Sequence, residues 1–407
     1  MQYSSLVLAN GLRIIHLPSD SPVSYCGIAV HAGTRDEQLG QYGLAHFVEH
    51  TLFKGTEKRK VRHILNRMEA VGGELNAYTT KEETFLYTIC LQEDTERAVE
   101  LLSDLIYHSK FPEAEIEKER EVVIDEIHSY EDSPSELIFD EFENIVFAGS
   151  DLGHAILGDV ESLQRFTSAS CRDFVKRFYH PENMIFFSYG KTPFPKICRY
   201  AEKYLSMNFQ SVPSRASRRC QESISSETIL KNKNLHQTHV VIGGKAYGLS
   251  EDKRMGLLLL TNILGGPGMN SRLNVSLREK YGLVYSVDAE VVSYTDTGIF
   301  TVYFGCDPES KDQCLHLIRK ELKSLRDKQL SGSQLSAAVK QWKGQLGISN
   351  ENKESVALRL GKNFLHFNRY DSLPQTYQKI EALTAEGLLE TANEIYDEKR
   401  LFSLIYQ

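Results

Sequence analysis

The chain has 407 residues, of which 41% are hydrophobic and 25% are charged. These fractions are typical of a globular protein with room for two domains, and they exclude an intrinsically disordered chain. A formal net charge of -8 disfavours binding to the phosphate backbone of nucleic acid. No apolar run approaches the roughly 20 residues that span a bilayer, and the first residues lack a signal-peptide pattern. The seven cysteines are scattered and odd in number, so we expect reduced thiols in a cytoplasmic protein without membrane or nucleic-acid partners.

Strand and helix patterns alternate along the first half of the chain. Asn10-Gly11 lies between two apolar runs, which predicts a β-hairpin over residues 5–17. Pro112 opens the longest helical pattern, and Pro134 ends or kinks it. The other expected helices cover 60–71, 95–108, 113–127, 135–147, 168–178 and 196–205, and the strands cover 25–31, 74–79, 83–90 and 183–189.

A change of composition divides the chain into two halves. Residues 209–233 are rich in Ser and charged residues, which indicates a linker between domains at 1–208 and 234–407. The second half repeats the order of the first with an offset of roughly 210 residues. Its expected strands cover 239–244, 283–291, 298–305 and 401–406, and its helices cover 253–264, 309–328, 333–347 and 353–368. We therefore expect an α+β fold of two homologous domains, each with a mostly antiparallel sheet covered by helices.

One stretch of the first half carries a clear chemical signal. If residues 43–50 are helical, His46 and His50 are one turn apart on one face. Two imidazoles at this spacing can bind one Zn²⁺, and Glu49 points to the same side, within reach of a water on that metal. The order H-x-x-E-H is the inverse of H-E-x-x-H. The alternative is a helix that carries two histidines and a glutamate without a metal.

A catalytic zinc needs a third protein ligand and an open position for water. The acidic helix at 113–127 offers Glu119 and Glu126, which are two turns apart and share a face. Its other glutamates are expected on a solvated surface: Glu113, Glu115, Glu117 and Glu121.

The residues around these positions resemble a known family. The segments His46-Phe-Val-Glu49-His50-Thr-Leu-Phe-Lys-Gly-Thr and Glu119-Arg-Glu-Val-Val-Ile-Asp-Glu126 are similar to the pitrilysin, insulin-degrading enzyme and mitochondrial processing peptidase group of zinc metallopeptidases. The resemblance extends over essentially the whole chain. It implies one Zn²⁺ per chain, held by His46, His50 and Glu126. It also implies that Glu49 is the general base, which takes a proton from the zinc-bound water.

The same resemblance implies roles for five further residues. Glu119 matches an acid of the family that supports the catalytic site from behind the metal ligands. Asn76 and Ala77 lie in the family's edge strand, where the substrate adds as an extra strand through main-chain hydrogen bonds. Arg278 and Tyr285 match an Arg–Tyr pair that holds a substrate carbonyl and donates to the tetrahedral intermediate. The alternative for this pair is structural: an Arg on a helix and a Tyr in a strand.

The resemblance also has implications for activity and assembly. It implies a zinc endopeptidase whose two domains close as a clamshell over unstructured peptides. Because relatives of this length have two domains and larger ones have four, we expect a homodimer. Each composite site would combine the zinc of one copy with Arg278 and Tyr285 of the other. Two alternatives stay open: a processing peptidase that cleaves a specific precursor or presequence, and a non-catalytic peptide-binding subunit of a peptidase complex.

Overall fold

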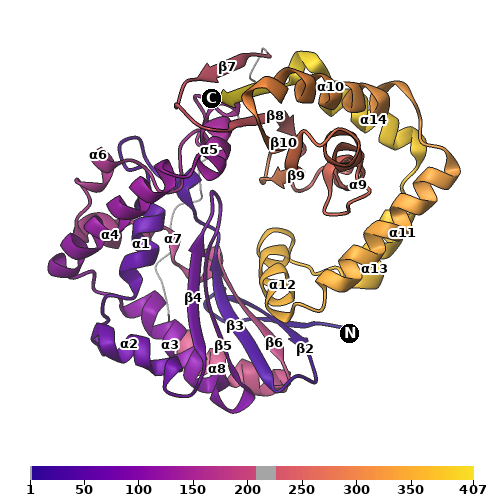
Figure 1. The fold of residues 1–407 in the computed structure, drawn as a ribbon. Helices are drawn as coiled ribbons and strands as arrows, with labels where there is room; N and C mark the ends of the chain where they lie inside the picture. Colours follow the sequence, from indigo (N-terminus) through magenta and orange to yellow (C-terminus); the bar gives the residue numbers. More distant parts are fainter. Residues whose placement is uncertain (1, 208–225) are drawn as a thin grey trace. The chain divides into compact units, whose positions relative to one another are not determined.

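The computed structural model describes residues 2–207 and 226–407, which form two compact units (Figure 1). The first unit comprises the described residues within 1–128, 154–217 and 349–372, and the second unit the remainder. Each unit is a β-sheet with helices, so the predicted α+β class is confirmed. Each unit also takes one helical segment from the opposite half of the sequence. Most of the stretch predicted as a linker lies outside the described residues, and its described end contains a strand.

The sheet of the first unit has six strands in the order β1-β2-β6-β3-β5-β4. All neighbours are antiparallel except β2 and β6, which are parallel. The predicted hairpin joins β1 to β2 through a turn in which Gly11 has φ 90°. The strands are β1 (Ser4–Val7), β2 (Arg13–Pro18), β3 (Val23–Val30), β4 (Glu74–Thr79), β5 (Thr84–Leu91) and β6 (Met184–Gly190).

Both faces of this sheet are buried, because successive side chains on each strand point to opposite sides. Ile14 and Phe186 pack into the core under the helices of the first half, whereas Ile15 and Phe187 pack under α12. The α-helices of the unit are α1 (Leu44–Leu52), α2 (Val61–Glu69), α3 (Thr95–His108), α4 (Glu113–Glu131), α6 (Val160–Leu163), α7 (Ser168–Phe178), α8 (Phe194–Leu205) and α12 (Lys353–Phe367). Short 3₁₀ turns are η1 (Thr34–Asp36), η2 (Gln92–Asp94) and η3 (Pro181–Asn183).

Helix α12 is bound to the first sheet by apolar and ionic contacts. Its buried stripe includes Leu360 and Phe364, spaced one turn apart. Gly361 lies so close to the sheet that an added Cβ would sit 2.9 Å from the Phe187 ring. Beside this stripe, the Glu83 carboxylate pairs with His366 at 2.5 Å and with Lys362 at 3.1 Å. Burial opposes the charge on Glu83, but these partners hold its pKa well below the usual range for a carboxyl.

Two buried histidines in separate parts of this unit make its stability dependent on pH. Burial lowers the pKa of His16, on β2, and that of His154 from the ordinary value of 6.5 to about 4. The unfolded chain therefore takes up protons below pH 6.5 that the native chain does not, and stability falls as pH decreases toward 4. Each histidine contributes a slope of at most about 1.4 kcal/mol per pH unit.

Urea unfolding of the wild type and of His16→Gln from pH 7.5 to 4.5 measures this dependence. Between pH 6.5 and 4.5, the free energy of unfolding should decrease less in the variant than in the wild type. Identical slopes for the two proteins would contradict this account of His16.

The second unit repeats the topology of the first. Its sheet has the order β7-β11-β8-β10-β9, with β7 and β11 parallel and the other neighbours antiparallel. This pattern matches β2-β6-β3-β5-β4 strand for strand, which confirms the predicted repeat. The strands are β7 (Thr228–Lys231), β8 (Thr238–Ala246), β9 (Val284–Ser293), β10 (Gly298–Cys306) and β11 (Phe402–Tyr406).

Helices again cover both faces of the second sheet. Val240 and Phe300 face one core, and Val241 and Ile299 face another, which packs under α5 (Pro134–Val146). The α-helices besides α5 are α9 (Arg254–Gly265), α10 (Lys311–Asp327), α11 (Gly332–Ser349), α13 (Leu373–Glu381) and α14 (Ala385–Ile395). The remaining turns are a π-helix, η4 (Asn274–Glu279), and two 3₁₀ turns, η5 (Pro308–Ser310) and η6 (Glu398–Arg400). Within the described residues, no helix is both long and apolar enough to cross a bilayer.

Candidate metal centre and active site

Helix α1 carries the H-x-x-E-H motif and begins at a strongly capped end. The carboxylate of Glu37 accepts hydrogen bonds from the backbone N–H groups of Gly43, at 2.9 Å, and Ala45, at 2.7 Å. Gly43 has φ 93°, and a Cβ there would lie 2.5 Å from the carbonyl oxygen of Leu157. Glycine is therefore required at this position. The apolar side of α1 is buried in the core of the first unit, so the helix has a fixed orientation.

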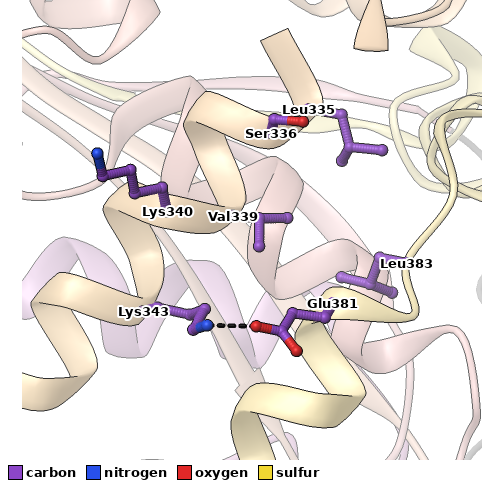
Figure 2. A pocket seen from close by; sticks show the side chains of 7 residues that line it. All are labelled: Leu335, Ser336, Val339, Lys340, Lys343, Glu381 and Leu383. Carbon is purple, nitrogen blue, oxygen red and sulfur yellow. Dashed lines mark hydrogen bonds and ion pairs between the residues drawn. The ribbon is translucent and has the colours of Figure 1, made fainter. Parts of the chain in front are cut away.

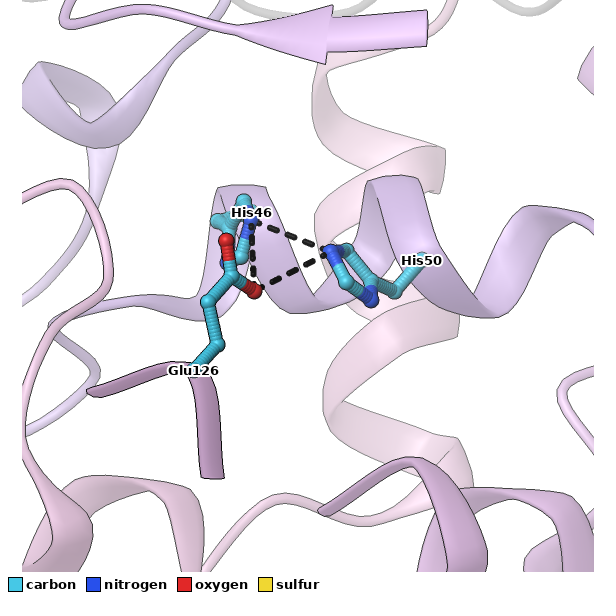
Figure 3. Close-up of side chains that lie close together, drawn as sticks. All are labelled: His46, His50 and Glu126. Atoms are coloured by element: carbon cyan, nitrogen blue, oxygen red, sulfur yellow. Dashed lines mark hydrogen bonds and ion pairs between the residues drawn. The ribbon is translucent and has the colours of Figure 1, made fainter. Parts of the chain in front are cut away.

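Three potential metal ligands converge beside α1 (Figure 3). The Nε2 atoms of His46 and His50 are 3.1 Å apart. Oε2 of Glu126, from α4, lies 3.8 Å from the first and 3.6 Å from the second. Among the described residues, this is the only group of three or more His, Cys, Asp or Glu side chains with ligand atoms close enough to hold one metal ion.

The hydrogen bonding of His50 fits a metal at this point. Its Nδ1 lies 3.0 Å from Oε1 of Glu119, so we assign the proton to Nδ1. Nε2 then presents a lone pair toward Nε2 of His46. Burial and the neighbouring His50 lower the pKa of His46 to about 3, which favours a neutral imidazole at His46. Two lone pairs at 3.1 Å repel each other unless a proton or a cation lies between them.

The separations also suit zinc. A tetrahedral Zn²⁺ with ligands at about 2.0–2.1 Å places them about 3.3 Å apart. The three distances in the structure, 3.1, 3.6 and 3.8 Å, lie within about 0.5 Å of that value. The donor set of two imidazoles and a carboxylate, with the Glu126 side chain 43% exposed to solvent, leaves room for a fourth ligand.

Glu119 contacts the candidate ligand His50, and Lys54 contacts Glu119. The Glu119 carboxylate is buried and contacts Nδ1 of His50 through one oxygen and the Lys54 ammonium, at 2.5 Å, through the other. Although burial opposes ionisation, these two partners lower the pKa of Glu119. Glu119 and Glu126 lie on the same face of α4. Glu119 contacts Nδ1 of the His50 ring, and Glu126 lies near Nε2 of the same ring.

Replacing Glu119 by Gln should weaken zinc binding. The amide is a poorer acceptor than the carboxylate, so His50 loses both orientation and basicity, and we expect a 10- to 100-fold lower affinity, on the order typical for such partners. Competition with a chromophoric chelator measures the dissociation constant. An affinity equal to that of the wild type would show that Glu119 has no part in holding the ligand.

Glu49 lies next to the three candidate ligands, His46, His50 and Glu126, but is not one of them. Its side chain is buried, and Oε2 accepts a hydrogen bond of 2.7 Å from the hydroxyl of Thr79. Burial raises the pKa of Glu49, while this hydrogen bond and the nearby His50 act in the opposite direction. A buried carboxylate with a raised pKa beside a metal is suited to accept a proton from water.

Strand β4 lies at the edge of the first sheet and contains Asn76 and Ala77. It pairs with β5 on one side and has no second strand beside it among the described residues. Leu75 and Ala77 pack against the core, and Thr79 follows on the same face by the alternation of side chains along a strand. The predicted edge strand is therefore present.

Two bacterial proteins that are named as uncharacterized zinc proteases are similar in sequence to this chain along nearly its full length. An uncharacterized zinc protease of Bacillus subtilis, YmxG, is 31% identical over 398 residues, which cover 97% of this chain and 96% of that protein. A model of the insulinase family, peptidase family M16, also matches the first part of the chain. The chain belongs to this family. The predicted family is thereby confirmed. A zinc protease of Streptomyces coelicolor, also uncharacterized, is 30% identical over 407 residues, or 98% of this chain and 88% of the relative.

Two models of the M16 family match successive parts of the chain. The insulinase (peptidase family M16) model matches residues 14–160, and the peptidase M16 inactive domain model matches residues 165–342. The metal group lies within the first match. Crystal structures of a Helicobacter pylori protease (TM-score 0.93, 21% identity) and of an M16 inactive domain from Pseudomonas fluorescens (TM-score 0.90, 17% identity) share the fold. The first alignment covers 100% of this chain and 99% of the other, and the second covers 100% and 98%.

The predicted Arg–Tyr pair of this M16 chain lies in the second unit. Arg278 is on the π-helix η4, and Tyr285 is the second residue of β9. The guanidinium carbon lies 5.7 Å from the centre of the Tyr285 ring, and Tyr285 is 87% exposed. The two side chains thus form one solvent-facing group.

The second unit contains a pocket of about 420 Å³, which lacks the chemical groups of the candidate metal centre (Figure 2). It is lined by residues of α11, α13 and the turn after α13, and an ion pair joins Lys343 to Glu381 in its wall. Its other lining side chains are mainly apolar, and it contains no group of metal ligands. The candidate active site of this M16 chain is therefore the group of side chains on α1, α4 and β4, and not this pocket.

Three residues with clear contacts at the M16 site were not predicted from the sequence: Glu37, Lys54 and Thr79. Thr79 had a detectable signal, because it places a hydroxyl on the face of β4 that carries Leu75 and Ala77. Glu37 and Lys54 act through contacts that sequence spacing does not encode.

Proposed function

We propose that this M16 chain is a zinc-dependent endopeptidase that hydrolyses unstructured peptides or short polypeptides. The observation that carries the proposal is the convergence of His46, His50 and Glu126 beside the buried carboxylate of Glu49. The relatives that are named zinc proteases support zinc as the ion, one per chain.

The proposed reaction assigns a step to each group. Zinc, when bound, lowers the pKa of a water molecule and polarises a peptide carbonyl. Glu49 accepts the proton that the water loses as its oxygen attacks the carbonyl carbon. The C–N bond then breaks, and the departing amine nitrogen takes up the proton that Glu49 had accepted, which restores the carboxylate. Glu119 keeps the His50 ring in the orientation that the metal requires.

The open edge of β4 supports a preference for extended peptides. A peptide that adds as a strand beside Asn76 and Ala77 is bound mainly through its backbone. Such binding requires a segment free of its own secondary structure and gives a loose sequence preference. Folded proteins would therefore be poor substrates.

We further propose that the active form is a homodimer with composite sites. The exposed pair of Arg278 and Tyr285 would bind the substrate carbonyl at the zinc site of a second copy. Mixing Glu49→Gln chains with Tyr285→Phe chains tests the sharing of sites. Activity above that of either variant alone supports it, and no recovery argues against it.

The endopeptidase proposal is tested by zinc content together with cleavage of a quenched peptide, with and without a chelator. We expect about one zinc per chain and cleavage that stops on chelation and returns with zinc. A protein without zinc and without cleavage would favour the non-catalytic subunit, although the intact Glu49 and three ligands speak against that alternative. Cleavage of one precursor and of no generic peptide would favour a processing peptidase.

A further inference from the structure

The hydroxyl of Thr79 is the group that orients the Glu49 carboxylate. The bond from Oγ1 to Oε2 is 2.7 Å long, and no other hydrogen bond reaches this carboxylate from the described residues. Hydrogen bonds to charged groups are among the stronger ones in proteins. Oε2 is held in this way, whereas Oε1 accepts no hydrogen bond from the described residues.

Thr79 itself is held firmly in place. It is the last residue of β4 and pairs with Thr84 on β5. In the turn that follows, the Thr80 N–H donates to the Glu83 carbonyl at 2.8 Å, and the Thr80 hydroxyl donates to the Glu83 carboxylate at 2.6 Å. The N–H of Thr34 donates to the Thr80 carbonyl at 3.2 Å. The end of β4 is thus anchored from two sides, and Glu83 is in turn paired with α12.

We propose that Thr79 is a positioning residue that fixes the general base relative to the strand on which the peptide lies. This inference rests on the proposed endopeptidase function. Thr79 joins two parts of the site that are distant in the sequence: the base on α1 and the substrate edge of β4. A base held by the substrate strand keeps its distance to the attacking water when a peptide is bound.

Steady-state kinetics of Thr79→Val and Thr79→Ser test the proposal. Valine keeps the shape and strand preference of threonine but lacks the hydroxyl, whereas serine retains it. We expect kcat to fall about 10- to 100-fold in the valine variant with little change in KM, and to return to within a few-fold of the wild type in the serine variant. Zinc affinity, measured by chelator competition, should be unchanged in both.

Thr84→Val is the matched control. It makes the same chemical change on the neighbouring strand, where the hydroxyl donates to the Ala32 carbonyl at 2.9 Å. This variant should lower the melting temperature without a selective loss of kcat. Equal losses for Thr79→Val and Thr79→Ser, or a parallel loss of zinc affinity, would overturn the positioning role. Wild-type kinetics in Thr79→Val would do so as well, whereas a wild-type protein that cleaves no peptide would overturn the proposed function and this inference with it.

Discussion

Replacement of Glu49 by Gln should abolish peptide cleavage while leaving the metal in place. The amide cannot accept a proton from water, so the general-base contribution of about 10²- to 10⁴-fold in rate is lost. The substitution is nearly isosteric, and the amide oxygen can still accept the hydrogen bond from Thr79. The change removes a buried group with a raised pKa, so the fold should tolerate it.

Cleavage of a quenched peptide, zinc content and thermal stability together decide this prediction. Glu121→Gln is the matched control, because it makes the same change at an exposed position on α4. The control should retain full activity. If Glu49→Gln cleaved peptide at a rate similar to that of the control, another group would have to act as the base.

Replacement of His50 by Ala should remove zinc binding altogether. One ring nitrogen of His50 contacts Glu119 and the other contacts Glu126, so the loss of His50 deletes a ligand and leaves Glu119 paired with Lys54 alone. We expect the affinity for zinc to fall by well over about 100-fold, which is more than the loss expected for Glu119→Gln. Activity should fall to the background level.

A readout independent of activity is the stabilisation of the native state by zinc. A ligand that binds only the native state raises the melting temperature with increasing concentration. Wild-type protein and the exposed control His63→Ala should both show this rise after chelator treatment and addition of zinc. Zinc-dependent stabilisation of His50→Ala equal to that of the control would show that zinc binds elsewhere.

Local sequence signals were sufficient for the elements that surround the site. Asn10-Gly11 identified the hairpin, and the spacing of His46 and His50 required one helical turn, which α1 supplies. Glu119 and Glu126 were expected to share a face because they are two turns apart, and both contact the His50 ring. These predictions depend on geometry within one element, which sequence spacing encodes.

Contacts between elements were harder to predict. Nothing in the local pattern of residues 353–367 indicates that α12 covers the first sheet, nor that α5 covers the second. The same limitation applies to Thr79 and Lys54, which act on residues far away in the chain. The helices α13 and α14 were not predicted, because with 9 and 11 residues they give only a short apolar periodicity.

We propose that one zinc ion at His46, His50 and Glu126 faces a peptide lying along β4. Anomalous diffraction at the zinc edge from crystals of Glu49→Gln protein, grown with a peptide that the wild type cleaves, tests this arrangement. We expect one zinc peak per chain bound by these three side chains, with the peptide paired to β4 beside Asn76 and Ala77. A zinc peak at other residues, or a peptide bound away from the edge of β4, would contradict it.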